Sequence, residues 1–200
     1  MKNIQNAKKS LLANRAELIV ALKKSLDHER FAHSLRVEKT ALALGKKYGV
    51  SPSAISLAAL LHDCARRYDR AGLLKMARRY RFHIDPIKKS EPKLFHGELG
   101  ALIAKEEFGV KSPAVLRAIS SHTTGAPSMS KLEKIIFLAD HLEEKRHFPG
   151  IERLRKLAAR DLDQAVEASS AATLKYLLEK KLPIHPDTLI TRNSYLKRTS

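Results

Sequence analysis

The residues best placed to do chemistry are an imidazole and a carboxylate that stand side by side, His62 and Asp63. They follow the apolar run 55–61, which has the pattern of a buried helix. A buried carboxylate is unfavourable unless a positive group pairs with it. A metal ion can satisfy both side chains, because it binds neutral imidazole and ionised carboxylate together. The pair therefore points to a metal site if other segments supply further ligands.

Four more polar side chains lie in or beside apolar helical patterns and complete the candidate ligand set: His33, His96, His122 and Asp140. A single histidine of this kind could be a hydrogen-bonded core residue, so the argument rests on all six together. No cluster of Arg or Lys lies on the same apolar faces to neutralise Asp63 and Asp140, so we expect a cation to do so. Nitrogen and oxygen ligands suit iron, manganese, zinc or magnesium rather than a thiolate zinc site. The remaining histidines and Cys64 are interpreted as surface or packing residues.

Capping signals divide the chain into the helices that must position these residues. Asp27, Ser51-Pro52 and Ser112-Pro113 begin helices, Gly49 ends one, and Ser130 to Glu133 is a capping box. Either Asp161 or Asp163 caps the longest late helix. No strand pattern, repeat or low-complexity segment interrupts the series, so the fold is predicted to be all-α. The expected helices are 11–26, 28–48, 52–61, 71–80, 95–108, 114–121, 132–143, 151–159, a segment ending near 180, and 187–196, followed by a frayed tail from Arg192.

Length and composition are those of one ordinary globular domain, predicted to span residues 1–200. Hydrophobic residues make up 44% of the chain and charged residues 30%. No apolar run reaches the roughly 18 residues that cross a bilayer, and no signal peptide is expected. A single cysteine cannot form an internal disulfide, which suits a reducing cytoplasm. The predicted location is therefore cytoplasmic, without a membrane partner.

A formal net charge of +17 sets the chain apart from average proteins. Residues 66–93 hold ten Lys or Arg against Asp69, Asp85 and Glu91. Such a segment could attract a polyphosphate or a nucleic acid, or it could simply be a solvated surface. Aromatic content is only 6% and Trp is absent, which argues against a base-stacking platform. Nucleic acid is therefore not the expected partner.

The order of the candidate residues, His33, then His62-Asp63, then Asp140, resembles the HD phosphohydrolase superfamily. More specifically, the chain resembles the YqeK family of HD proteins over about residues 28–166. The stretches that carry this resemblance are 33–37, 61–66, 94–101, 119–125, 137–143 and 146–155. The resemblance implies an HD-domain helical bundle with a metal site in its core and a C-terminal helical extension. The first predicted helix, the end of the chain and the net charge lie outside it.

The resemblance also implies an activity, hydrolysis of diadenosine tetraphosphate to two ADP by a symmetrical tetraphosphatase that uses iron or a similar divalent metal, in one or two ions. Carried over by position, the metal ligands would be His33, His62, Asp63 and Asp140. His96 and His122 would contact the phosphates or hold a second metal. The implied phosphate or nucleotide contacts are Arg36, Arg66, Thr123, Arg146 and Arg153, each of which could instead form a surface ion pair. The implied partners are a nucleotide substrate and an ADP- or GDP-type product, and the sequence leaves open whether the chain forms a homodimer.

The ligand types suggest how such a site would act. A divalent cation lowers the pKa of water, and the hydroxide attacks phosphorus. His62 and Asp63 would act as ligands, and an unligated His96 or His122 could stabilise the transition state or protonate the leaving oxygen. Two other readings stay open. The chain could be another HD phosphohydrolase, a nucleotidase or a phosphodiesterase, or it could be a basic RNA-binding protein with a structural metal.

Overall fold

The computed structural model describes residues 15–196, and every regular element in that range is helical, as predicted. Two of the elements, η1 and η2, are short 3-10 helices. The elements are α2 (Arg15–Ser25), α3 (His28–Tyr48), α4 (Pro52–Leu61), η1 (Cys64–Arg67), α5 (Arg70–Arg79), α6 (Pro86–Ser90), η2 (Pro92–Phe95), α7 (His96–Glu106), α8 (Pro113–Ser121), α9 (Lys131–Leu142), α10 (Ile151–Ala158), α11 (Leu162–Glu179) and α12 (Pro186–Ser194).

Most of the predicted caps set the helix boundaries. The Asp27 side chain accepts a hydrogen bond from Arg30 N at 2.9 Å and begins α3. Gly49 ends α3 with a φ of 68°, a left-handed conformation that glycine adopts without strain. The capping box of Ser130 begins α9, and Asp161, rather than Asp163, caps α11. Ser51 precedes α4 but makes no side-chain capping hydrogen bond.

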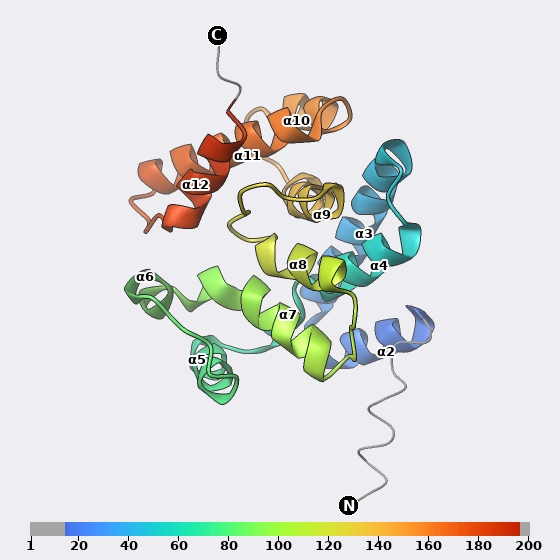
Figure 1. Ribbon diagram of the computed structural model, residues 1–200, viewed down its shortest axis with the longest axis vertical. Helices are drawn as coiled ribbons and strands as arrows, with labels where there is room; N and C mark the ends of the chain where they lie inside the picture. The colour runs from blue at the N-terminus through green and yellow to red at the C-terminus, as the bar shows by residue number, and fades with distance from the viewer. Residues whose placement is uncertain (1–14, 197–200) are drawn as a thin grey trace, which may run out of the picture.

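Helix α9 lies in the middle of the molecule, with α8 and α7 on one side and α10 to α12 on the other (Figure 1). Its residues Ile135, Ile136 and Leu138 are fully buried, which is why this segment is apolar on every side. Helices α3 and α4 pack against each other and against α9. Helices α3, α4, α7, α8 and α9 therefore form the frame from which the candidate side chains project. Most of α11 and all of α12 form the predicted C-terminal extension.

The structure bears on two predictions about the ends of the chain. The first predicted helix includes residues 11–14, which lie outside the described range. The tail was expected to fray from Arg192, but Arg192 belongs to α12 and donates from Nε to Glu167 Oε1 at 3.1 Å. Only residues 197–200 of that tail lie outside the description. Within residues 15–196, none of the helices combines the length and the apolar character that crossing a bilayer would need.

Candidate metal centre

The structure brings the six predicted side chains to one place. His33 Nε2 lies 3.0 Å from Asp140 Oδ1 and 3.3 Å from His62 Nε2. His96 Nε2 lies 3.0 Å from Asp63 Oδ1, and His122 Nε2 lies 3.8 Å from the same oxygen. Three overlapping sets each place their ligand atoms within 4.8 Å of one another. These sets are His33 with His62 and Asp63, His62 with His122 and Asp140, and Asp63 with His96 and His122.

Helix ends position most of the cluster. His62 directly follows α4, His96 is the first residue of α7, and His122 directly follows α8. Gly97 allows the start of α7 to approach the end of α8 closely. A Cβ at this position would lie 2.9 Å from Ser120 O and 3.0 Å from His122 Nδ1, closer than side-chain carbons approach other atoms. The absence of a side chain at Gly97 therefore lets His96 lie against His122.

The histidine rings are oriented by backbone carbonyl groups. Nδ1 of His62 donates to Ala59 O at 2.7 Å, and Nδ1 of His122 donates to Ile119 O at 2.7 Å. Nδ1 of His96 donates to Lys93 O at 2.5 Å. Because a carbonyl oxygen only accepts, each Nδ1 carries the proton and each Nε2 presents a lone pair to the cluster in the neutral ring. Such second contacts fix the tautomer of ligand histidines in metal sites.

The pair of His96 and His122 tests whether this donor set fits a cation. Their Nε2 atoms face each other at 2.9 Å. With both Nδ1 atoms donating to carbonyl groups, two lone pairs meet at this contact, and only a shared positive charge makes it favourable. Asp63 Oδ1 lies 3.0 Å from the nearer of the two nitrogens and adds negative charge. The donor set therefore fits a bound cation, with nitrogen and oxygen atoms of the kind that first-row divalent metals prefer.

Burial and neighbouring charge keep His62, His122, Asp63 and Asp140 in the protonation states that bind metals. Burial lowers the pKa of His62, and burial together with nearby His96 lowers the pKa of His122 to about 3, so both rings are neutral at pH 7. Burial alone would raise the pKa of Asp63 and of Asp140. Neighbouring histidines outweigh that effect and hold both carboxyl pKa values well below their usual range. Two ionised carboxylates thus stand beside the two neutral imidazoles of His62 and His122.

The expectation that no cluster of Arg or Lys neutralises the carboxylates overlooked single arginines, one beside each carboxylate. Arg146 donates to Asp140 Oδ1 at 2.8 Å, and Arg30 Nη1 lies 3.8 Å from Asp63 Oδ2. Arg146 follows the end of α9 and so is absent from its apolar face, which explains why helical periodicity did not reveal it. In residues 15–196, no hydrogen bond or ion pair joins an arginine to His96 or His122. The facing lone pairs of those rings therefore still call for a cation.

A cavity of about 510 Å³ adjoins the cluster and is lined by several cations. Arg66 lines it and forms no ion pair within the described residues, while Arg36 also lines it but donates to Glu143 at 2.9 Å and to Glu29 at 2.7 Å. Thr123 Oγ1 lies 3.4 Å from His122 Nε2. Arg66, Arg36, Arg146 and Thr123 therefore lie close to the cluster.

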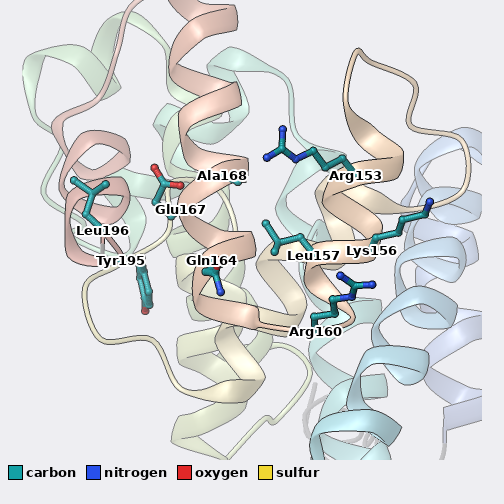
Figure 2. A pocket seen from close by; sticks show the side chains of 9 residues that line it. All are labelled: Arg153, Lys156, Leu157, Arg160, Gln164, Glu167, Ala168, Tyr195 and Leu196. Carbon is teal, nitrogen blue, oxygen red and sulfur yellow. The ribbon is translucent and has the colours of Figure 1, made fainter. Parts of the chain in front are cut away.

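Arg153 does not join this group. It is exposed on α10 and lines a separate cavity of about 690 Å³ between α10, α11 and α12. Figure 2 shows it extending from α10 toward Ala168 of α11. The resemblance placed Arg153 beside the substrate, but the direction of its side chain on α10 takes it elsewhere.

The sequence analysis did not predict that Arg30, Glu143 and Lys145 belong to the site, although they line the cavity beside the cluster. Glu143 is only 2% exposed, and its carboxylate accepts hydrogen bonds from His33 Nδ1 at 3.3 Å and from Arg36. Helical spacing could have revealed two of these residues, because side chains three positions apart lie on the same face of a helix. Glu143 lies three residues after Asp140, and Arg30 lies three residues before His33. Cys64 is a packing residue, as interpreted. It is buried, its thiol donates to Gly100 O at 3.4 Å, and burial raises its pKa to about 12.

Comparison with known proteins identifies the family. Residues 30–145 match the HD domain and include all six cluster residues. The chain is 40% identical to "Bis(5'-nucleosyl)-tetraphosphatase, symmetrical" of Halalkalibacterium halodurans, over 92% of this chain and 97% of that protein. It is 35% identical to the protein of the same name from Bacillus subtilis, over 90% and 96%.

A solved structure supports the same assignment. The crystal structure of a "predicted HD superfamily hydrolase involved in NAD metabolism" from Clostridium acetobutylicum superposes with a TM-score of 0.87 at 34% identity, over 91% of this chain and 96% of that one. The chain therefore belongs to the HD-domain family, in the group that contains the symmetrical bis(5'-nucleosyl)-tetraphosphatases.

Proposed function

We propose that this protein hydrolyses dinucleoside tetraphosphates symmetrically, with diadenosine tetraphosphate and water giving two ADP. Water adds across the central phosphoric anhydride, so one P–O bond forms, one breaks, and one proton is released for each new phosphate end. The observation that carries the proposal is the cluster of six nitrogen and oxygen ligands beside a cation-lined cavity. Relatives also support the proposal, because the chain is 34–40% identical, over most of its length, to three symmetrical tetraphosphatases.

We assign the metal to His33, His62, Asp63 and Asp140. The neighbouring set of Asp63, His96 and His122 would hold a second ion or contact the phosphates. A bound divalent cation would supply activation of water and polarisation of a phosphoryl oxygen. Iron is the first choice because the family resemblance implies it, and manganese, magnesium and zinc are alternatives because nitrogen and oxygen donors suit all four metals.

The side chains around the metal would bind and orient the tetraphosphate. Arg66 can donate to a phosphate without breaking an ion pair of the described chain. Arg146 and Arg36 are close enough to contribute after they loosen their carboxylate contacts. Thr123 can donate a hydroxyl hydrogen bond beside His122. We place the protein in the cytoplasm, because its single cysteine is buried and free.

The test combines metal analysis with product analysis. Purified protein is expected to contain a divalent metal and to convert diadenosine tetraphosphate to two ADP, while Asp63→Ala abolishes the reaction. Formation of AMP and ATP, or faster cleavage of simple nucleotides, would contradict the symmetrical reaction and favour another HD phosphohydrolase. Normal hydrolysis by a folded Asp63→Ala protein would reject the enzyme assignment. A basic RNA-binding protein would instead show RNA binding that survives Asp63→Ala and disappears at high salt.

A further inference from the structure

The short turn after α9, residues 143–146, reaches back to two of the assigned metal ligands. Glu143 ends the helix with φ −54° and ψ 157°, which turns the chain out of the helical path. Its carboxylate accepts from His33 Nδ1 at 3.3 Å. Arg146 donates from Nη2 to Asp140 Oδ1 at 2.8 Å and from Nε to Asp140 O at 3.0 Å. The position of this turn therefore sets the surroundings of both His33 and Asp140.

One side chain from another helix holds the turn in place. Arg155 of α10 donates from Nε to Leu142 O at 2.9 Å, and from Nη2 to Glu143 O at 2.8 Å and to Arg146 O at 3.3 Å. The last carbonyl groups of an α-helix have no intrahelical donor, so the contact with Leu142 O satisfies an acceptor that α9 leaves open. The other two contacts bind carbonyl groups of the turn itself, where Glu143 O also accepts from Arg146 N at 2.9 Å. Three carbonyl groups from successive parts of one turn match the planar fork of a guanidinium, which a lysine ammonium does not reproduce.

Arg155 acts at a distance from the cavity. It is absent from the residues that line the cavity beside the cluster, and its side chain is 27% exposed. Its remaining contact is an ion pair of Nη1 with Glu152 on its own helix. Within residues 15–196, every hydrogen bond that the Arg155 side chain makes outside α10 is thus to the backbone of the segment 142–146.

We propose that Arg155 is a positioning residue for the metal centre. By holding the backbone of residues 142–146, it places the Glu143 carboxylate against His33 and the Arg146 guanidinium against Asp140. The inference rests on the metal ligands proposed above. It assigns Arg155 no contact with substrate or metal, so its effect is transmitted only through Glu143 and Arg146.

The test compares Arg155→Lys with Arg160→Lys. Both changes keep the charge, and Arg160 is an exposed residue just after α10 that forms no ion pair within the described chain. The dissociation constant for Mn²⁺ is measured by electron paramagnetic resonance, and kcat and KM are measured for diadenosine tetraphosphate. Arg155→Lys is expected to weaken Mn²⁺ binding about tenfold, the range seen when contacts behind metal ligands are removed. It should lower kcat by a similar factor with little change in KM, whereas Arg160→Lys should change neither.

A second variant separates positioning from general stability. Arg155→Ala leaves a space that is partly open to solvent, so added guanidinium ion is expected to restore Mn²⁺ affinity, whereas methylammonium at the same concentration does not. Loss of affinity without such rescue, in parallel with a lower melting temperature of the metal-free protein, would make Arg155 purely structural and overturn the proposal. If Arg155→Lys is too unstable to study, Mn²⁺ affinity can be measured instead on Arg155→Ala that has been refolded with guanidinium present.

The outcomes also distinguish this inference from the metal assignment. If the wild-type chain binds Mn²⁺ and Arg155→Lys binds it equally well with unchanged kcat, the positioning role is wrong and the metal site stands. If the wild-type chain binds no divalent metal, the ligand assignment fails and the role of Arg155 fails with it.

Discussion

At the scale of single residues, His33 has a position unlike that of the other histidines in the cluster. Its Nε2 faces Asp140 and its Nδ1 faces Glu143, so carboxylates lie on both sides of the ring. Burial by itself lowers the pKa of His33, but the hydrogen bond and the charge of Asp140 outweigh burial and raise it above its ordinary value. His62 and His122 show the opposite shift. In the metal-free protein, His33 therefore holds a proton more readily than His62 or His122 does.

This difference predicts how metal binding depends on pH. A metal needs His33 neutral, so protons compete with it below the raised pKa of His33. We expect Mn²⁺ affinity to increase as pH rises through that pKa. The metal-free protein should show the reverse trend in stability, because the protonated His33 pairs with Asp140 below the pKa and loses that pairing above it. Titrations of Mn²⁺ and melting curves of metal-free protein, from mildly acidic to mildly alkaline pH, check both signs. An affinity that stays constant over this range would contradict the prediction.

Sequence reasoning selected the six side chains that the structure brings together, because each follows or lies within an apolar helical pattern, a local signal. It missed the pairing of Arg146 with Asp140, because that contact passes through the turn after α9 and leaves no periodic trace. It also selected Arg153, two positions before the residue that contacts the turn. The two side chains differ by about 200° around α10, and only packing against α9 decides which of them faces the centre.

At the scale of elements, the close approach of α7 to α8 depends on Gly97. Helical Gly→Ala changes normally stabilise a protein by roughly 0.5–1 kcal/mol. At Gly97 the added methyl would lie 2.9 Å from both Ser120 O and Thr123 Oγ1, so the helix ends must separate. We expect Gly97→Ala to lower the melting temperature and to reduce kcat by about 10- to 100-fold, because His96 moves relative to His122. Circular dichroism and steady-state kinetics check this. A more stable variant with full activity would show that the approach is not required.

The sequence predicts well where the helices lie along the chain, but it does not predict which helices pack against each other. Asp27, Gly49 and the Ser130 capping box fix boundaries through neighbours only a few residues away. Ser51 carried the same kind of signal without making the capping bond, since its hydroxyl contacts Ser53 instead. Which helices lie side by side depends on side-chain packing between distant segments, and here the family resemblance supplied what the helix pattern alone did not.

At the scale of the whole molecule, the proposed metal joins segments that are far apart in the chain. His33 is on α3, His62 and Asp63 follow α4, and Asp140 is on α9. A ligand that binds only the folded state adds about 2.7 kcal/mol of stability at a concentration 100 times its dissociation constant. For a chain of this size, that corresponds to an increase in melting temperature of roughly 5–10 °C. We expect a chelator to lower the melting temperature by about this amount and added Mn²⁺ to restore it. Asp140→Asn, which removes one ligand charge, should abolish most of the response, and an equal response in that variant would point to a different site.

The spacing of the ligands along the chain also bears on when the metal can enter. During synthesis, His33, His62 and Asp63 leave the ribosome long before Asp140, which is encoded 107 positions after His33. A partly made chain can offer the ion only an incomplete set of donors, with weaker affinity and less discrimination between metals. Loading with the correct ion is therefore expected after translation has passed Asp140 and α9 has packed against α3, so the metal supply at that stage decides which ion the finished protein holds.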